Sequence, residues 1–176
     1  MTRTPDDLGS LVAPLPRRPL RADELLGIVL EVASRPGLWA PHTPPGGHER
    51  HYVCLHRDAH LDLWAIFWMP ENDTGWHDHD VSSGAVGVVR GALVEHALRI
   101  GGDDRETVHR SGGAFSFGPS HIHRLTCREP ASASIHAYSP PLWRLGQYAV
   151  SPDGVLHRRS VSYADELRPL QLSGVG

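Results

Sequence analysis

Lysine is absent from this chain of 176 residues, and all 17 basic residues are arginine. A mechanism that needs a lysine Schiff base or a lysine general base is therefore excluded. The sequence has only two cysteines, Cys54 and Cys127, which excludes a disulfide scaffold and a cysteine-rich structural zinc site. It also has no apolar run long enough to span a bilayer, so no membrane association is expected.

The first 20 residues contain prolines and acidic residues where a secretory signal peptide needs a continuous apolar stretch. The sequence therefore predicts a cytoplasmic protein. Its net charge is −3, and because nucleic-acid binding requires a clustered cationic surface, no nucleic-acid partner is expected. We expect residues 1–20 to form an extended or partly disordered lead-in, and residues 21–176 to form one domain.

The pattern of apolar residues changes once along the chain. Helical spacing predicts an amphipathic helix over 21–37, and the prolines and glycines of 39–47 predict a loop. A final helical turn is predicted over 162–167. The intervening chain has short strand-like runs without interleaved helices, which is typical of an all-β sandwich or barrel. The nine predicted strands are 51–56, 61–69, 84–89, 93–100, 113–117, 122–127, 132–138, 147–150 and 155–161.

Histidine is in excess, with 13 residues, and four of them form two His-x-His pairs. In an extended segment His77 and His79 point to the same side, about 7 Å apart, which allows them to share a metal ion. His121 and His123 repeat the arrangement later in the chain. A single pair on a surface loop is more often solvated than ligating, but two pairs within a β-rich chain favour a metal site formed by histidines alone. Neutral imidazoles suit iron, zinc, copper or nickel.

A third polar group lies on one face of a predicted strand. Ser134, His136 and Tyr138 share that face, while the apolar residues between them share the other. If the polar face lined a cavity, Ser134 could anchor His136, and His136 could orient the Tyr138 hydroxyl near a bound ligand. The alternative is a buried hydrogen bond with no role beyond satisfying polar groups. A cis peptide bond before Pro140 is compatible with the end of this strand.

Together these motifs resemble the cupin superfamily. Its first motif, Gly-x5-His-x-His-x3,4-Glu-x6-Gly, is similar to the segment containing His77, His79 and Gly91, although the opening glycine is missing and Gly84 stands in place of the glutamate. Its second motif begins Gly-x5-Pro, like residues 113–119. The resemblance implies an all-β cupin double-stranded β-helix, a jelly-roll barrel, with a short N-terminal helical segment.

The segments HDHDVSSGAVGVVRGALVEH, PSHIHRLTC and SIHAYSPPL are similar to the thiol dioxygenase branch of cupins, the cysteine dioxygenase family of bacterial type, over about residues 50–141. This resemblance implies an Fe(II) cofactor held by three of the histidines. His121 lies near the site or is an alternative to His123, and spacing alone does not decide between them. The implied metal ligands are His77, His79 and His123, and the implied catalytic relay is Ser134, His136 and Tyr138.

Two positions depart from the cysteine dioxygenase pattern. Gly84 lies near the position at which some family members have a cysteine that forms a thioether with the active-site tyrosine, so this cross-link is excluded here. Cys54 aligns with an arginine that pairs with the substrate carboxylate, and a thiol cannot replace a bidentate guanidinium. Either the substrate is not ordinary cysteine, or another arginine takes the carboxylate, the candidates being Arg50, Arg57 and Arg144.

The predicted function is therefore a non-haem Fe(II) dioxygenase that adds O2 to a small thiol, cysteine or a related thiol carboxylate, to give a sulfinate. A metal-dependent cupin lyase or isomerase and a non-enzymatic cupin that binds a small ligand are the alternatives. The expected partners are the thiol and O2, with a monomer or homodimer as the oligomeric state. Five apolar residues are expected to exclude water from the site: Trp64, Ile66, Val86, Val88 and Phe117.

Overall fold

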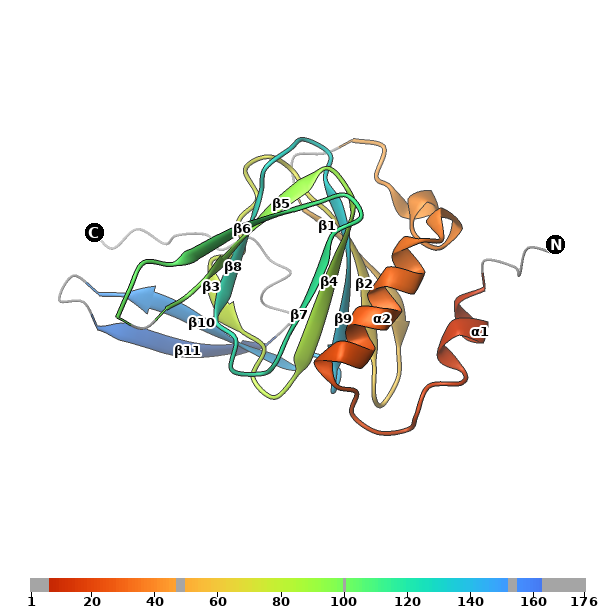
Figure 1. Ribbon diagram of the computed structural model, residues 1–176, viewed down its shortest axis with the longest axis horizontal. Coiled ribbons are helices and arrows are strands. Elements are labelled where there is room, and N and C mark those ends of the chain that lie inside the picture. Colours follow the sequence, from red (N-terminus) through yellow and green to blue (C-terminus); the bar gives the residue numbers. More distant parts are fainter. Residues whose placement is uncertain (1–6, 47–49, 100, 152–154, 163–176) are drawn as a thin grey trace.

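The computed structural model describes residues 7–46, 50–99, 101–151 and 155–162 (Figure 1). Its N-terminal part contains α1 (Leu8–Val12), α2 (Ala22–Ala33) and two 3-10 turns, η1 (Pro36–Leu38) and η2 (Ala40–His42). The helix predicted over 21–37 thus corresponds to α2 and η1. The extended lead-in and the loop predicted over 39–47 each contain a short helical element instead.

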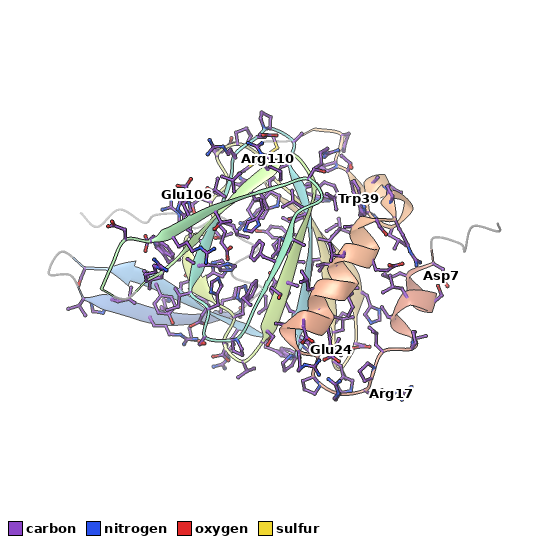
Figure 2. All side chains as sticks on the ribbon, viewed as in Figure 1. Asp7, Arg17, Glu24, Trp39, Glu106 and Arg110 are labelled. Atoms are coloured by element: carbon purple, nitrogen blue, oxygen red, sulfur yellow. The ribbon has the colours of Figure 1, made fainter. Side chains whose placement is uncertain are left out.

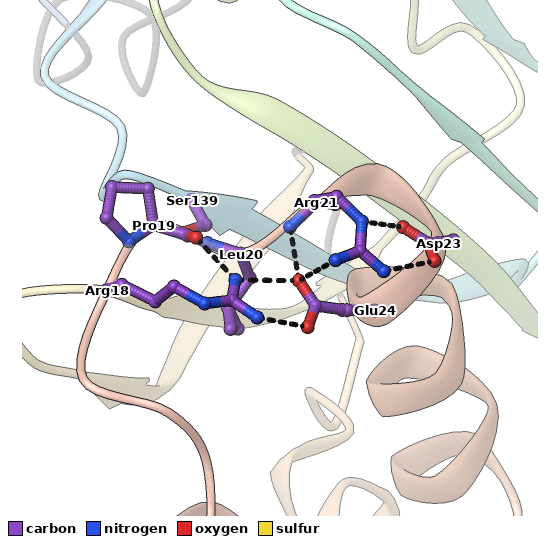
Figure 3. A network of polar contacts seen from close by, with 7 residues as sticks. All are labelled: Arg18, Pro19, Leu20, Arg21, Asp23, Glu24 and Ser139. Atoms are coloured by element: carbon purple, nitrogen blue, oxygen red, sulfur yellow. Dashed lines mark hydrogen bonds and ion pairs between the residues drawn. The ribbon is translucent and has the colours of Figure 1, made fainter.

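Figure 3 shows how charged side chains fix the start of α2. Glu24 accepts a hydrogen bond from the Arg21 backbone N–H at 2.8 Å, and the Arg18 guanidinium donates to both carboxylate oxygens of Glu24, at 3.0 and 2.7 Å. Such an acidic residue in the first turn satisfies backbone donors that have no partner within the helix. Just before the helix, the Leu20 N–H donates to Ser139 Oγ at 2.7 Å, so the helix start is tied to the end of a central strand.

Eleven antiparallel strands in the described residues form two sheets, which confirms the all-β prediction. One sheet contains, in spatial order, β1 (His51–Arg57), β2 (Asp62–Phe67), β9 (Ala133–Ser139), β4 (Ser83–Arg90) and β7 (Ala114–Phe117). The other contains β11 (Leu156–Ser162), β10 (Arg144–Val150), β3 (Trp76–Asp78), β8 (His123–Cys127), β5 (Ala92–Ala97) and β6 (Arg105–Arg110).

Each of the nine predicted strands has a counterpart, and two further strands are present. β3 has only three residues and consists largely of the first histidine motif, so it lacks an apolar pattern. β6 is a polar strand at the edge of its sheet, where Glu106 and Arg110 lie on the outside (Figure 2). Of the helical turn predicted over 162–167, Ser162 is the last residue of β11 and the remainder lies outside the described residues.

The central strand β9 separates the apolar core from the polar interior. All seven of its residues are buried. Ala133, Ile135 and Ala137 belong to the apolar cluster that α2 completes with Leu25, Val29 and Val32. Because side chains alternate along a strand, the other face of β9 turns to the space between the sheets. α2 therefore covers one face of the five-stranded sheet (Figure 1), and Ser134, His136 and Tyr138 lie on the opposite face.

No helix among the described residues has both the length and the apolar character required to cross a membrane.

Candidate metal centre

Three buried histidines meet where β3 and β8 pair. His77 on β3 lies directly opposite His123 at the start of β8, and His79 follows β3 by one residue. Their exposed fractions are 4, 1 and 2 % respectively. The centroid of the His77 ring is 4.8 Å from those of His79 and His123, and one ring nitrogen from each histidine lies within 4.8 Å of the other two. The register of two short strands thus brings the two His-x-His motifs together.

The surroundings keep two of these imidazoles, His79 and His123, neutral. Burial, followed by the nearby imidazoles of His77 and His123, holds the pKa of His79 well below its ordinary value of 6.5. Burial likewise lowers the pKa of His123 to about 3, although the hydrogen bond to Glu95 opposes this shift. A histidine must be neutral to bind a metal through a ring nitrogen, so protons would not compete with a metal here at neutral pH.

The donor atoms fit a metal ion. His77 Nδ1 lies 3.0 Å from the Gly75 carbonyl oxygen, which can only accept, so Nδ1 carries the proton and Nε2 is the nitrogen that could ligate. Within the described part of the chain, His123 Nε2 and His79 Nδ1 are buried without a hydrogen-bond partner. Leaving such an atom unsatisfied costs about 1–3 kcal/mol. A metal ion bound by the three histidines would remove this cost.

Beside the histidines, β9 carries a chain of hydrogen bonds. Ser134 Oγ lies 2.8 Å from His136 Nε2, and His136 Nδ1 lies 3.0 Å from the Tyr138 hydroxyl oxygen. Trp68 Nε1 donates to Ser134 Oγ at 2.8 Å and extends the chain. Burial, together with the nearby His123 imidazole and Arg50 guanidinium, lowers the pKa of His136 to about 3, so its ring is neutral. The predicted contacts between Ser134, His136 and Tyr138 are therefore present.

Ring stacking brings this chain against the metal-ligand candidates. The Tyr138 ring lies on the His79 ring, with centroids 5.1 Å apart and 28° between the planes. Phe117 stacks on His79 at 4.7 Å. The Tyr138 hydroxyl, held by His136, thus belongs to the same site as the three histidines.

A cavity of about 40 Å³ opens between the two sheets at this point. This volume accommodates about three water-sized groups, which suits a small ligand. Its polar lining includes His77, His123, His136 and Arg50. Its apolar lining includes Trp64, Ile66 and Val86, three of the residues expected to exclude water. Val88 and Phe117 are buried in the adjoining apolar clusters.

The four candidates for substrate recognition lie in different places. Arg50 lines the cavity, with its guanidinium carbon 4.9 Å from the Tyr52 ring centroid and 5.2 Å from that of Trp68. The Arg57 Nη2–H donates to Oδ2 of buried Asp62 at 2.7 Å. Arg144 is exposed on β10, and Cys54 is exposed on β1. None of these three is among the cavity-lining residues.

Residues 48–151, more than half of the chain, match the family model of cysteine dioxygenase type I. They include all three histidines, the β9 hydrogen-bond chain and Arg50. The chain belongs to the cysteine dioxygenase type I family. No match was found among curated proteins.

Solved structures with a similar fold include KdgF from Halomonas sp., with 22 % identity, a TM-score of 0.45, and coverage of 55 % of this chain and 82 % of that one. A cupin superfamily protein from Desulfitobacterium hafniense DCB-2 has 8 % identity, a TM-score of 0.48, and coverage of 58 and 86 %. Inferences about function therefore depend on the family match and on the site's own geometry.

Sequence reasoning missed a carboxylate beside the three histidines. Glu95 Oε1 accepts hydrogen bonds from His123 Nδ1 at 3.1 Å and His121 Nε2 at 2.9 Å, and Oε2 lies 3.1 Å from His109 Nε2. Burial alone would raise the pKa of Glu95, but these hydrogen bonds outweigh it and hold the pKa well below its usual range. The alternation of Leu93, Glu95 and Ala97 on one strand face was the available signal.

The Phe117 ring occupies the space that a side chain at Gly84 would need. A Cβ atom at Gly84 would lie 2.4 Å from Phe117 Cζ and 3.2 Å from Tyr138 Cδ1. Gly84 is therefore a close-packing position as well as one that lacks a thiol. Phe117 can stack on His79 because Gly84 has no side chain.

Proposed function

We propose that this chain is an Fe(II)-dependent thiol dioxygenase acting on a small thiol that carries a carboxylate, such as cysteine. In the proposed reaction both atoms of O2 join the sulfur of R–SH to give R–SO2H, so the sulfur is oxidised and O2 is reduced. The observation that carries the proposal is that His77, His123, His136 and Tyr138 line one small cavity, with the His79 ring stacked on Tyr138 and Ser134 hydrogen-bonded to His136. Membership of the cysteine dioxygenase type I family supports it.

The three histidines would hold the metal, each through one ring nitrogen. Imidazole suits several divalent metals, and the family favours Fe(II) among them. When bound, Fe(II) would supply open coordination positions for a thiolate and for O2. The protein's own part is to hold His77, His79 and His123 fixed. All three are buried, and hydrogen bonds to the Gly75 carbonyl and to Glu95 orient the rings of His77 and His123.

Tyr138 would orient the reacting groups by donating a hydrogen bond to them. If Trp68 donates to Ser134 and Ser134 donates to His136 Nε2, then His136 Nδ1–H donates to the Tyr138 oxygen. In that direction the Tyr138 hydrogen points away from His136, and the phenol acts as a donor beside the histidines. A neutral His136 is required for this arrangement, and its lowered pKa supports it.

Arg50 would bind the substrate carboxylate in place of the arginine that Cys54 replaces. Its guanidinium is held over two aromatic rings at the cavity wall, which leaves its planar donors suited to a bidentate pair with a carboxylate. The apolar wall formed by Trp64, Ile66 and Val86 excludes water, which strengthens such a pair.

The test measures O2 uptake by protein loaded anaerobically with Fe(II), with cysteine, 3-mercaptopropionate and cysteamine as substrates. We expect O2 uptake with cysteine and 3-mercaptopropionate, and much less with cysteamine, which lacks the carboxylate. Arg50→Ala should reduce kcat/KM for cysteine by roughly 10- to 150-fold, since a hydrogen bond to a charged group is worth about 1.5–3 kcal/mol. Arg144→Ala is the matched control. Metal binding without thiol-dependent O2 uptake would contradict the proposal and favour a cupin lyase, an isomerase or a binding protein.

A further inference from the structure

Asp78 lies between the two metal-ligand candidates His77 and His79, yet the proposed chemistry does not use it. Its side chain is on the opposite face of the strand from these histidines. The residue is only 6 % exposed, and its carboxylate accepts hydrogen bonds from several partners. The donors are the backbone N–H of Gly146 at 3.0 Å, the Tyr148 hydroxyl at 2.5 Å, the backbone N–H of Asp80 at 2.9 Å, and Arg158 through Nε at 2.8 Å and Nη2 at 2.9 Å.

Three of these partners belong to the C-terminal hairpin formed by β10 and β11. β10 pairs with β3 so that Gly146 is opposite Asp78 and Gln147 is opposite His77. On its other side β3 pairs with β8 through His77 and His123. A strand of three residues has few ladder hydrogen bonds of its own, so its position depends on these neighbours.

The Arg158 guanidinium occupies the space that a side chain at Gly146 would need. A Cβ atom at Gly146 would lie 2.3 Å from Arg158 Nε and 2.6 Å from Cζ, well inside contact distance. The guanidinium therefore lies flat against the Gly146 backbone and reaches Asp78 with two parallel hydrogen bonds. A bidentate pair of this kind fixes orientation as well as distance.

We propose that Arg158 is a positioning residue for the metal centre, which it serves by locking Asp78 and thereby the directions of His77 and His79. Arg158 lies beyond residues 48–151, the part of the chain that matches the family model. The inference rests on the proposed metal centre. In this proposal the β10–β11 hairpin fixes the position of β3 from the side of the strand opposite the histidines.

The test is Co(II) titration of the full-length protein, with the visible absorption spectrum as a reporter of ligand geometry. Arg158→Ala should weaken Co(II) binding and shift the Co(II) bands. The roughly 10- to 100-fold loss caused by removing a direct partner of a metal ligand is the upper limit, because Arg158 acts through Asp78. Gly146→Ala should act in the same direction, although it keeps both charged partners, because it displaces the guanidinium. Arg158→Lys should recover only part of the affinity, since lysine cannot form the bidentate pair.

Arg159→Ala is the control, because Arg159 is the exposed next residue of the same strand. The inference is overturned if Arg158→Ala and Gly146→Ala bind Co(II) with the affinity and spectrum of the unmodified protein, or if Arg159→Ala has the same effect. Should Arg158→Ala fail to fold, Gly146→Ala and Arg158→Lys decide the question. An unmodified protein that does not bind Co(II), or binds it equally well after His77→Ala, would contradict the proposed metal centre instead.

Discussion

Substitution of Glu95 tests whether a carboxylate orients the metal-ligand candidate His123. Glu95 Oε1 is the acceptor for His123 Nδ1, and His123 is only 1 % exposed, so water cannot readily replace a lost partner. In Glu95→Ala the Nδ1–H would be buried without an acceptor, at a cost of about 1–3 kcal/mol. The ring could escape this cost by turning, which would misdirect Nε2.

We therefore expect Glu95→Ala to weaken Fe(II) binding by about 10- to 100-fold, or roughly 1.4–2.7 kcal/mol. Glu95→Gln retains one acceptor oxygen and should lose less. The assay is anaerobic competition for Fe(II) against a chelator, with thermal unfolding measured in parallel. Glu106→Gln, an exposed glutamate on the neighbouring strand β6, is the control. Fe(II) affinity in Glu95→Ala equal to that of the unmodified protein would refute the reasoning.

Three further predictions concern the polar chain and the packing beside it. Tyr138→Phe should lower kcat about 100-fold and leave Fe(II) affinity unchanged; an unaltered kcat would exclude the phenol from the reaction. The pKa values of His123 and His136 fall to about 3 in the folded protein, so the unfolded chain binds more protons than the folded chain as the pH drops through 6.5. The free energy of unfolding of the metal-free protein, measured in urea, should therefore decrease by about 1.4 kcal/mol per group between pH 7.5 and 5.5. His136→Gln should reduce this loss, and a stability independent of pH would contradict it. Gly84→Cys should destabilise the fold by about 1–3 kcal/mol, because the new side chain would collide with Phe117. The new cysteine should form no thioether with Tyr138. An intact-protein mass lower by two hydrogens would show that the cross-link does form.

The strands that carry an apolar pattern could be predicted from sequence, whereas polar or very short ones could not. Ala133, Ile135 and Ala137 alternate with Ser134, His136 and Tyr138, and this period of two identifies both β9 and its faces. β6 has no such pattern because it is an exposed edge strand. Residues 8–12 contain a helix despite nearby prolines, because Asp7 accepts a hydrogen bond from the Gly9 N–H and caps it.

Within the site, contacts between neighbours along the chain were predictable and distant ones were not. The Ser134–His136–Tyr138 chain follows from alternation on one strand. The partner Trp68 directly follows β2 and the partner Glu95 lies on β5, and their positions depend on sheet register, which local sequence does not specify. The same holds for the choice between His121 and His123: pairing opposite His77 brings His123 into the histidine group, whereas His121 turns to Glu95.

The proposed reaction transfers both atoms of O2 to a thiol held beside the three histidines. Mass spectrometry of the product formed from cysteine and isotopically labelled O2 by Fe(II)-loaded protein tests this directly. We expect a sulfinate in which both oxygens carry the label, with formation abolished in His77→Ala. A sulfur product without label, or no sulfur oxidation by protein that binds Fe(II), would contradict it.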